Sequence, residues 1–249
     1  MADLALPARQ GPRILIYHQV GSGRSHEMNV SVRSFRRHLD WMQLHGEIVS
    51  LENAIGRRAE PGSHRLFVLT FDDGYADVFF NAFPLLEAAR IPFTLYLTSG
   101  PIENSDKFGE WPGQPLTWDQ VRQMCDSGLV TLGAHTHSHP DLRELAPHAL
   151  REELDRSNGL INTRCHVKPS HFTYPWGRWS ATADSIIRET YATATLGSGP
   201  AVSADSDLYT LHRVPIQRSD PGLLFRRKIL SGGRSEDRMR RMARGYDGP

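Results

Sequence analysis

The sequence has few cysteines, no long apolar run and almost no net charge. Its 249 residues include only two cysteines, Cys125 and Cys165, and neither belongs to a paired motif. Two free thiols in a reducing compartment are expected rather than a disulfide framework. No stretch approaches the roughly 18 uninterrupted apolar residues of a membrane-spanning helix. The first ten residues lack the basic start and apolar core of a signal peptide. These absences predict a cytoplasmic protein, although a periplasmic chain whose leader had been removed would look the same.

The formal net charge of +1 argues against a polyanionic partner such as nucleic acid. The C-terminal stretch differs from the rest, because eight basic residues between Arg226 and Arg244 stand against Glu236 and Asp237. One interpretation is a solvated terminal helix. The other is a basic patch that touches an anionic membrane surface or an acidic polymer.

Apolar runs alternate with amphipathic segments along the chain, a pattern that predicts an α/β fold with a parallel sheet buried on both faces. At this length, a single large domain with a substantial core is expected. Strands are predicted at residues 14–17, 47–51, 65–71, 92–97, 129–132, 172–174 and 191–195. Helices are predicted at residues 34–45, 51–58, 77–89, 117–127, 147–164 and 181–189. Residues 100–115 are predicted to form a loop, and residues 209–216 an extended segment.

The residues able to do chemistry fall where these strands end. They are His18, Asp72, Asp73, His135 and Tyr174. Parallel α/β barrels place their active sites at the carboxyl ends of their strands. We therefore expect these side chains to meet at one end of the molecule.

Asp72 and Asp73 close the most apolar of the predicted strands. Asp73-Gly74 could be no more than a turn, since Asp-Gly is a common turn dipeptide. A turn does not need two charges, however, and neighbouring carboxylates are costly unless a cation or a proton relieves them. The pair therefore indicates a metal-binding or catalytic role.

Residues 135–140 read His-Thr-His-Ser-His-Pro. The i, i+4 spacing of His135 and His139 would let the two imidazoles meet on one side of a helical turn. His137 is out of phase and is expected to face solvent or to support a ligand. One aspartate and two histidines can hold a divalent ion and leave positions open for water and substrate. The second aspartate is then free to act as a base on that water.

Together these segments resemble a known family. Residues 70–74, Thr-Phe-Asp-Asp-Gly, followed by residues 135–140, resemble the polysaccharide deacetylases of carbohydrate esterase family 4, the nodulation-deacetylase homology group. Ile-Tyr-His at residues 16–18 and Phe-Thr-Tyr-Pro-Trp-Gly at residues 172–177 extend the resemblance to roughly residues 13–216. The Tyr-His pair is most similar to the subgroup of poly-N-acetylglucosamine deacetylases.

The resemblance implies a distorted (β/α) barrel of six to eight strands that removes N-acetyl, or less often O-acetyl, groups from sugars. It implies that Asp73, His135 and His139 bind the metal and that Asp72 is the general base. The metal is expected to be Zn²⁺, with Co²⁺, Ni²⁺ or Mn²⁺ as substitutes. The catalytic domain would span residues 11–218, followed by a basic helical tail over residues 219–249. The expected partner is an N-acetylated glycan.

Two departures from the family pattern concern the acid and the base. The family often carries an arginine before Pro175 that pairs with the base, but Thr173 and Tyr174 stand there, so Arg178 or Arg213 would have to supply the charge. The late Leu-x-His motif that often provides the general acid is one residue short at His212. The resemblance to the Tyr-His subgroup favours His18 as the acid, with His212 as the alternative.

Tyr174, Pro175 and Trp176 would bind substrate, with the two aromatic rings forming part of the groove wall; core packing is the alternative for these rings. A backbone N–H at Tyr174 or a neighbour would assist the oxyanion. Two other functions remain open: a carbohydrate-binding protein without catalytic activity, and a hydrolase of a non-sugar amide or an O-acetyl ester.

Overall fold

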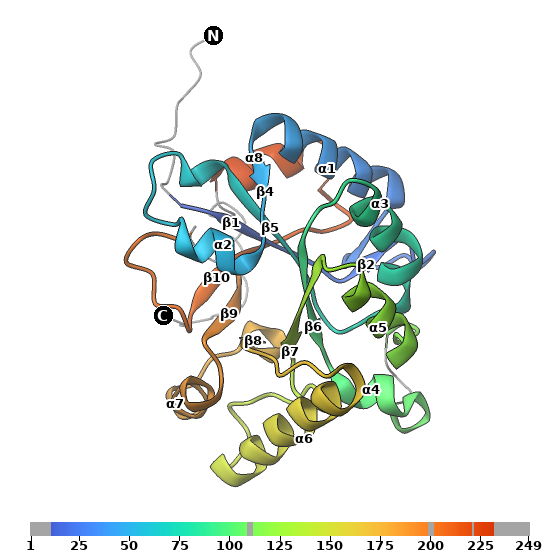
Figure 1. Ribbon diagram of the computed structural model, residues 1–249, viewed down its shortest axis with the longest axis vertical. Coiled ribbons are helices and arrows are strands. Elements are labelled where there is room, and N and C mark those ends of the chain that lie inside the picture. The colour runs from blue at the N-terminus through green and yellow to red at the C-terminus, as the bar shows by residue number, and fades with distance from the viewer. Residues whose placement is uncertain (1–10, 109–111, 199–201, 221, 232–249) are drawn as a thin grey trace.

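A seven-stranded parallel barrel forms the centre of the computed structural model, which describes residues 11–108, 112–198, 202–220 and 222–231. Its strands follow the order β1-β10-β9-β8-β7-β6-β5 and close through pairing of β1 with β5, while β4 adds to the start of β5 (Figure 1). The strands are β1 (Arg13–Tyr17), β4 (Glu47–Ile48), β5 (Leu66–Phe71), β6 (Phe93–Leu97), β7 (Val130–Ala134), β8 (His171–Thr173), β9 (Thr193–Ser198) and β10 (Leu211–Pro215). The predicted distorted (β/α) barrel is thus confirmed.

Helices surround the barrel (Figure 1). The α-helices are α1 (Val32–His45), α2 (Leu51–Gly56), α3 (Phe83–Ala88), α4 (Ser99–Glu103), α5 (Trp118–Asp126), α6 (Pro147–Cys165), α7 (Ala181–Thr190) and α8 (Leu223–Ser231). Shorter elements are the strands β2 (Gln19–Val20) and β3 (Asn29–Val30), the 3-10 turns η1 (Ser63–Arg65), η3 (Ser105–Phe108) and η4 (Pro175–Gly177), and the π-helical turn η2 (Val78–Ala82). Several helices begin at a hydroxyl side chain that accepts a backbone N–H of the first turn. These caps are Ser31, Ser50, Thr117 and Ser180.

The barrel strands are buried because helices cover the outside and side chains fill the inside. All six residues of β5 are buried. The ring of Phe71 at its end lies 5.6 Å from Tyr17, 5.9 Å from Phe35 and 5.7 Å from Phe93, centroid to centroid. Truncating such a ring to alanine costs about 3–5 kcal/mol of stability. This packing holds the residues that follow β5 in place.

Three segments differ from the sequence-based predictions. The helix predicted at residues 77–89 is divided into η2 and α3, since Pro84 at the start of α3 has no N–H to donate to the preceding turn. The loop predicted at residues 100–115 contains most of α4 and all of η3. The first part of the basic tail is a packed helix, because α8 buries Phe225 and Ile229; residues 232–249 lie outside the described residues.

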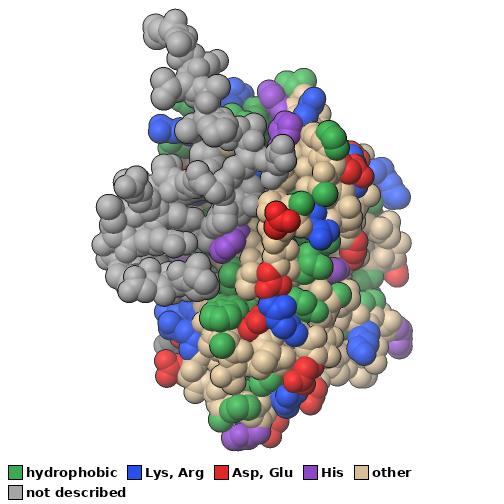
Figure 2. All heavy atoms as spheres, turned by 90° about the vertical axis from the view of Figure 1, so that its left-hand side faces the viewer, with side chains coloured by type: hydrophobic (Ala, Val, Ile, Leu, Met, Phe, Trp, Pro, Cys, Tyr) green, Lys and Arg blue, Asp and Glu red, His purple; other side chains and the backbone are tan. Residues whose placement is uncertain are grey.

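Acidic and basic side chains are interspersed among the described residues on the face drawn in Figure 2, in keeping with the net charge of +1. The chemistry-bearing residues instead gather at the carboxyl ends of the strands. His18 follows β1, the two aspartates follow β5, and His135 follows β7.

Candidate active site

The carboxylate pair sits in a strained turn directly after β5. The Asp72 N–H donates to the carbonyl of Tyr17 at 3.0 Å, which continues the β1–β5 ladder for one more residue. Asp73 then adopts a left-handed conformation with φ 73°, and Gly74 follows with φ 83°. A Cβ on Gly74 would meet Ile102 at 3.0 Å, so glycine suits both the backbone and the space. The turn gives the two neighbouring carboxylates different partners, Arg213 for Asp72 and the histidines His135 and His139 for Asp73.

The histidine segment after β7 forms an irregular loop, and the predicted helical turn is wrong. Thr136 and His139 both have positive φ, 65° and 60°, which no right-handed helical turn allows. Glu153 of α6 holds the loop, because its carboxylate accepts the N–H groups of His137 and Ser138 at 3.0 and 2.8 Å and the Ser138 hydroxyl at 2.8 Å. Non-glycine residues with positive φ cost free energy and cluster at functional sites.

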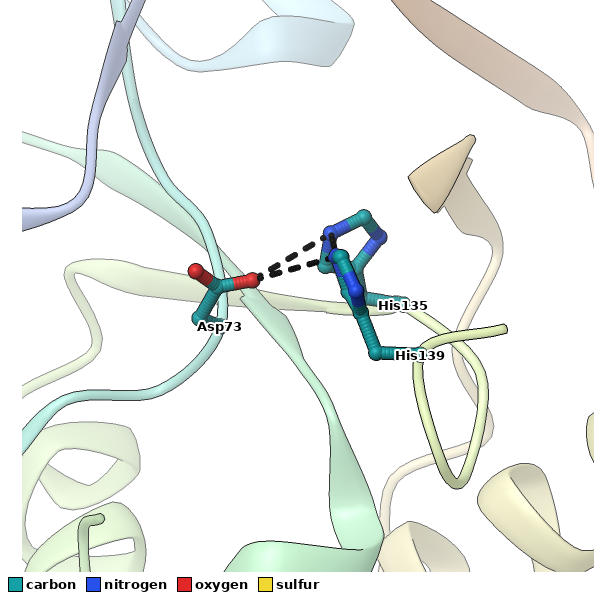
Figure 3. A group of neighbouring side chains, drawn as sticks. All are labelled: Asp73, His135 and His139. Carbon is teal, nitrogen blue, oxygen red and sulfur yellow. Dashed lines mark hydrogen bonds and ion pairs between the residues drawn. The ribbon is translucent and has the colours of Figure 1, made fainter. Parts of the chain in front are cut away.

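Asp73, His135 and His139 converge on one point (Figure 3). Asp73 Oδ1 lies 3.4 Å from His135 Nε2 and 3.6 Å from His139 Nε2, and the two Nε2 atoms are 3.1 Å apart. A tetrahedral ion with bonds of about 2.0–2.1 Å would place its ligand atoms about 3.3 Å from one another. The three side chains therefore have the spacing of a ligand set.

The hydrogen bonds around this triad suit a cation. His135 Nδ1 lies 2.8 Å from the carbonyl oxygen of Thr173, so Nδ1 carries the ring proton and Nε2 offers a lone pair. Asp73 Oδ1 is buried and has no hydrogen-bond partner of normal geometry in the described part of the chain. An orphaned carboxylate oxygen that faces two imidazole nitrogens is costly without a positive charge. The residues present thus fit a divalent metal ion.

The charges of the neighbouring groups favour the ligating forms. Burial raises the pKa of Asp73, but His135, His18 and His139 outweigh burial and hold it well below its usual range. Burial and the neighbouring His135 lower the pKa of His139 to about 4. At neutral pH, an ionised Asp73 therefore faces a neutral His139.

Asp72 is held by Arg213, which comes from β10. The guanidinium donates two hydrogen bonds of 2.7 Å, one to each carboxylate oxygen of Asp72, and only 2% of the Arg213 surface is exposed. Burial raises the pKa of Asp72, but the charge and hydrogen bonds of Arg213 outweigh it and lower the pKa overall. Asp72 is thus an ionised carboxylate beside the triad.

Arg213 fills the role of the arginine absent before Pro175. It is itself fixed by Thr70 at 2.8 Å, by Thr173 at 2.6 Å and by the carbonyl of Leu196 at 3.0 Å. Arg178, the other candidate, binds Asp141 at 2.6 Å instead. Arg213 was only one of two arginines that the sequence offered, and neither its contact with Asp72 nor the role of Glu153 had a local sequence signal.

The two candidate acids differ in position. His18 is half-buried and directly follows Tyr17, whose carbonyl accepts the Asp72 N–H at 3.0 Å, so it lies next to the carboxylate pair. His212 precedes Arg213 on β10, and successive side chains of a strand point to opposite faces. Because Arg213 points toward Asp72, His212 is directed away from it.

The aromatic residues after β8 divide between core and surface. The side chain of Tyr174 is buried, and its hydroxyl donates to Asp184 at 3.1 Å. Its ring therefore packs in the core, as the alternative to the groove wall predicted. The Tyr174 N–H donates to the carbonyl of Thr195 at 3.1 Å, and the oxyanion role of this N–H or a neighbouring one stays a prediction. Pro175 is also buried, whereas Trp176 is 66% exposed with its ring centroid 4.8 Å from that of His139. Trp176 therefore lies beside the triad, open to solvent.

Comparison with known proteins agrees with this geometry. The sequence model of the family described as Polysaccharide deacetylase matches residues 59–194, more than half of the chain. The chain therefore belongs to the polysaccharide deacetylase family.

Three known proteins are similar to this chain over most of its length. YxkH of Bacillus subtilis is 27% identical over 217 residues, which are 85% of this chain and 74% of that protein. The poly-beta-1,6-N-acetyl-D-glucosamine N-deacetylase of Escherichia coli is 26% identical over 201 residues, 65% of this chain but only 30% of that protein. The structure of IcaB from Ammonifex degensii aligns with a TM-score of 0.74 at 26% identity, covering 91% of this chain and 98% of the other.

Proposed function

We propose that this protein is a metal-dependent hydrolase that removes N-acetyl groups from amino-sugar-containing glycans and releases acetate. The observation that carries the proposal is the convergence of Asp73, His135 and His139 beside the ionised Asp72. Membership in the polysaccharide deacetylase family supports the reaction class. The names of the related glucosamine deacetylases support an N-acetylated amino sugar as the substrate.

Asp73, His135 and His139 would hold the ion, and Zn²⁺ suits two imidazoles and one carboxylate, with Co²⁺, Ni²⁺ or Mn²⁺ as substitutes. A divalent cation held there would supply Lewis acidity that polarises an amide oxygen and lowers the pKa of a water molecule. Side chains of the protein carry out the proton transfers. Asp72 accepts a proton from the attacking water, and Arg213 keeps this carboxylate ionised and oriented.

His18 donates a proton to the departing amine, since a protonated imidazole near neutral pH suits this step. Trp176 offers an exposed aromatic face beside His139, against which a sugar ring can stack. Both roles are proposed from the positions of His18 and Trp176 beside the triad.

The test measures acetate release from N-acetylglucosamine oligomers. We expect release to stop after treatment with a chelator and to resume when Zn²⁺ is added back. Equal rates with and without chelator would remove the metal mechanism. A parallel panel of O-acetyl esters and non-sugar amides would separate the proposed substrate class from the alternative ones.

A carbohydrate-binding protein without activity is the rival account. Its motives are the arginine missing before Pro175 and the displaced late histidine, His212; the contact between Arg213 and Asp72 speaks against the first of them. Tight glycan binding without acetate release at any metal loading would favour the rival.

A further inference from the structure

Helices α1 and α8 form one surface on the outside of the barrel, far from α6 (Figure 1). The two helices pack together through Phe225 of α8, whose ring stacks on His38 at 3.8 Å and lies 5.8 Å from Trp41. Their outward-facing side chains define what we call the α1–α8 face: Arg33, Arg36, Arg37, Leu44, Leu223, Leu224, Arg226, Arg227 and Leu230.

The first unusual property of the α1–α8 face is its exposed leucines. Of the six large hydrophobic side chains exposed among the described residues, four belong to it, namely Leu44 at 78%, Leu223 at 78%, Leu224 at 51% and Leu230 at 66%. Leu223 and Leu230 are two helical turns apart and lie opposite the buried Phe225 and Ile229. Helix α8 therefore has apolar residues on both its inner and its outer side.

The second property is a set of arginines that make no contact with acids. Within the described part of the chain, no side-chain hydrogen bond or ion pair engages the guanidinium groups of Arg33, Arg36, Arg37, Arg226 or Arg227, and Asp40 is the one acidic residue on the two helices. Several exposed arginines on other helices do have acidic partners, such as Arg151 with Glu189 at 2.7 Å and Arg164 with Glu103 at 2.6 Å. The α1–α8 face thus carries five arginines, while its two helices supply a single acidic residue, Asp40.

Helix α8 is firmly anchored beneath this face. The ammonium group of Lys228 is buried against Asp220 at 2.7 Å, and Arg13 Nε donates to the carbonyl of Ile229 at 3.1 Å. These contacts fix the rotation of α8 about its axis. The exposed leucines and arginines of α8 are therefore presented together on its outer side.

We propose that the α1–α8 face binds the surface of an anionic lipid bilayer. Arginines interleaved with leucines suit a helix that lies in the plane of the interface, with leucines among the acyl chains and guanidinium groups at the phosphates. An acidic polymer would match the arginines but would leave the leucines without apolar partners. Among the described helices, none has the length and apolar character of a membrane span.

The test is co-sedimentation of the purified protein with vesicles, which does not depend on the proposed deacetylase activity. We expect binding to vesicles of phosphatidylcholine mixed with phosphatidylglycerol, little binding to phosphatidylcholine alone, and loss of binding as salt is raised. Each arginine at an anionic surface contributes about a fivefold change in partitioning, so Arg226→Gln with Arg227→Gln should weaken binding roughly 25-fold.

The matched control is Arg151→Gln with Arg156→Gln, which removes the same charge from exposed positions of α6. This control should bind like the unaltered protein; an equal loss would overturn the proposal, because net charge alone would explain it. Leu223→Ser with Leu230→Ser should also weaken binding. If these leucine changes had no effect, or if heparin bound and vesicles did not, the surface would serve an acidic polymer and the lipid assignment would be wrong. Circular dichroism of each variant verifies its fold.

Discussion

Arg213 on β10 and Asp72 after β5 meet through two parallel hydrogen bonds of 2.7 Å, across 141 positions of sequence. Both side chains are buried. The pair joins two strands on opposite sides of β1 and fixes the carboxylate that we propose as the base.

Replacing Arg213 by methionine should leave Asp72 buried without its counter-charge. We expect a loss of about 3–5 kcal/mol in the free energy of unfolding, measured by urea denaturation, because removing one partner of a buried ion pair leaves the other charge buried and uncompensated. The pKa of Asp72 should rise, which moves the acidic limb of the activity profile to higher pH. Arg178→Met is the control, since Arg178 is half-exposed and binds Asp141, and it should change stability by no more than about 1 kcal/mol. Equal effects of the two changes would contradict the role of Arg213.

Glu153 should control metal affinity without touching the metal. Glu153→Ala removes the acceptor for two backbone N–H groups and one hydroxyl of the histidine loop, so His139 loses its fixed position. We expect about a 10- to 100-fold loss in Zn²⁺ affinity, measured by competition with a chromogenic chelator. Glu152→Ala is the matched control, because Glu152 is the exposed preceding residue of the same helix. If Glu153→Ala left the Zn²⁺ affinity unchanged, the histidine loop would keep its conformation without Glu153, and the prediction would be wrong.

The general acid can be assigned by comparing two histidines. His18→Gln should lower turnover by about 10²- to 10⁴-fold, since the leaving amine loses its proton donor. His212→Gln should leave turnover within a few-fold, because its side chain points away from Asp72. Steady-state kinetics over a range of pH would decide, and the reverse ranking would make His212 the acid.

At the other end of the barrel, Glu52 should make stability depend on pH. The hydrogen bond from His171 at 2.7 Å lowers the pKa of Glu52 from its ordinary value near 4.5 to about 2. A lowered carboxyl pKa contributes stability above the unfolded-state value and loses it as pH falls toward the folded-state value. Glu52→Gln should therefore cost about 1 kcal/mol near pH 6, an amount reduced because the carboxylate is half-exposed, and much less near pH 2. Thermal unfolding at both pH values tests this, and an equal cost at both would contradict it.

Much of the barrel could be predicted because its strands carry their own signal. The segments that become β1, β5 and β6 form apolar runs and are buried throughout. Such runs are typical of parallel strands whose sheet is covered by helices. The closure of β1 on β5 could not be predicted, since it joins segments about fifty residues apart through tertiary packing. The division of the helix at residues 77–89 had a visible cause in Pro84.

The candidate metal-binding triad of Asp73, His135 and His139 was recognisable for a similar reason. Aspartate and histidine at strand ends stand out in any sequence, so Asp73, His135 and His139 were found before their geometry was known. The conformation of the loop that joins the histidines could not be predicted. The positive φ of Thr136 follows from the surrounding structure and runs against the local preference of a threonine. Glu153 looks the same in sequence as the exposed Glu152, and only the position of α6 distinguishes them. The cytoplasmic location stays a prediction.

The most direct test of the account is the metal content of two neighbouring variants, measured by elemental analysis after loading with Zn²⁺ and desalting. We expect the unaltered protein and Asp72→Asn to retain a single equivalent of zinc, with turnover lost in Asp72→Asn, and Asp73→Asn to retain none. Zinc retained by Asp73→Asn and lost from Asp72→Asn would mean that the two aspartates have the opposite roles. No stoichiometric metal in the unaltered protein would contradict the proposed mechanism altogether.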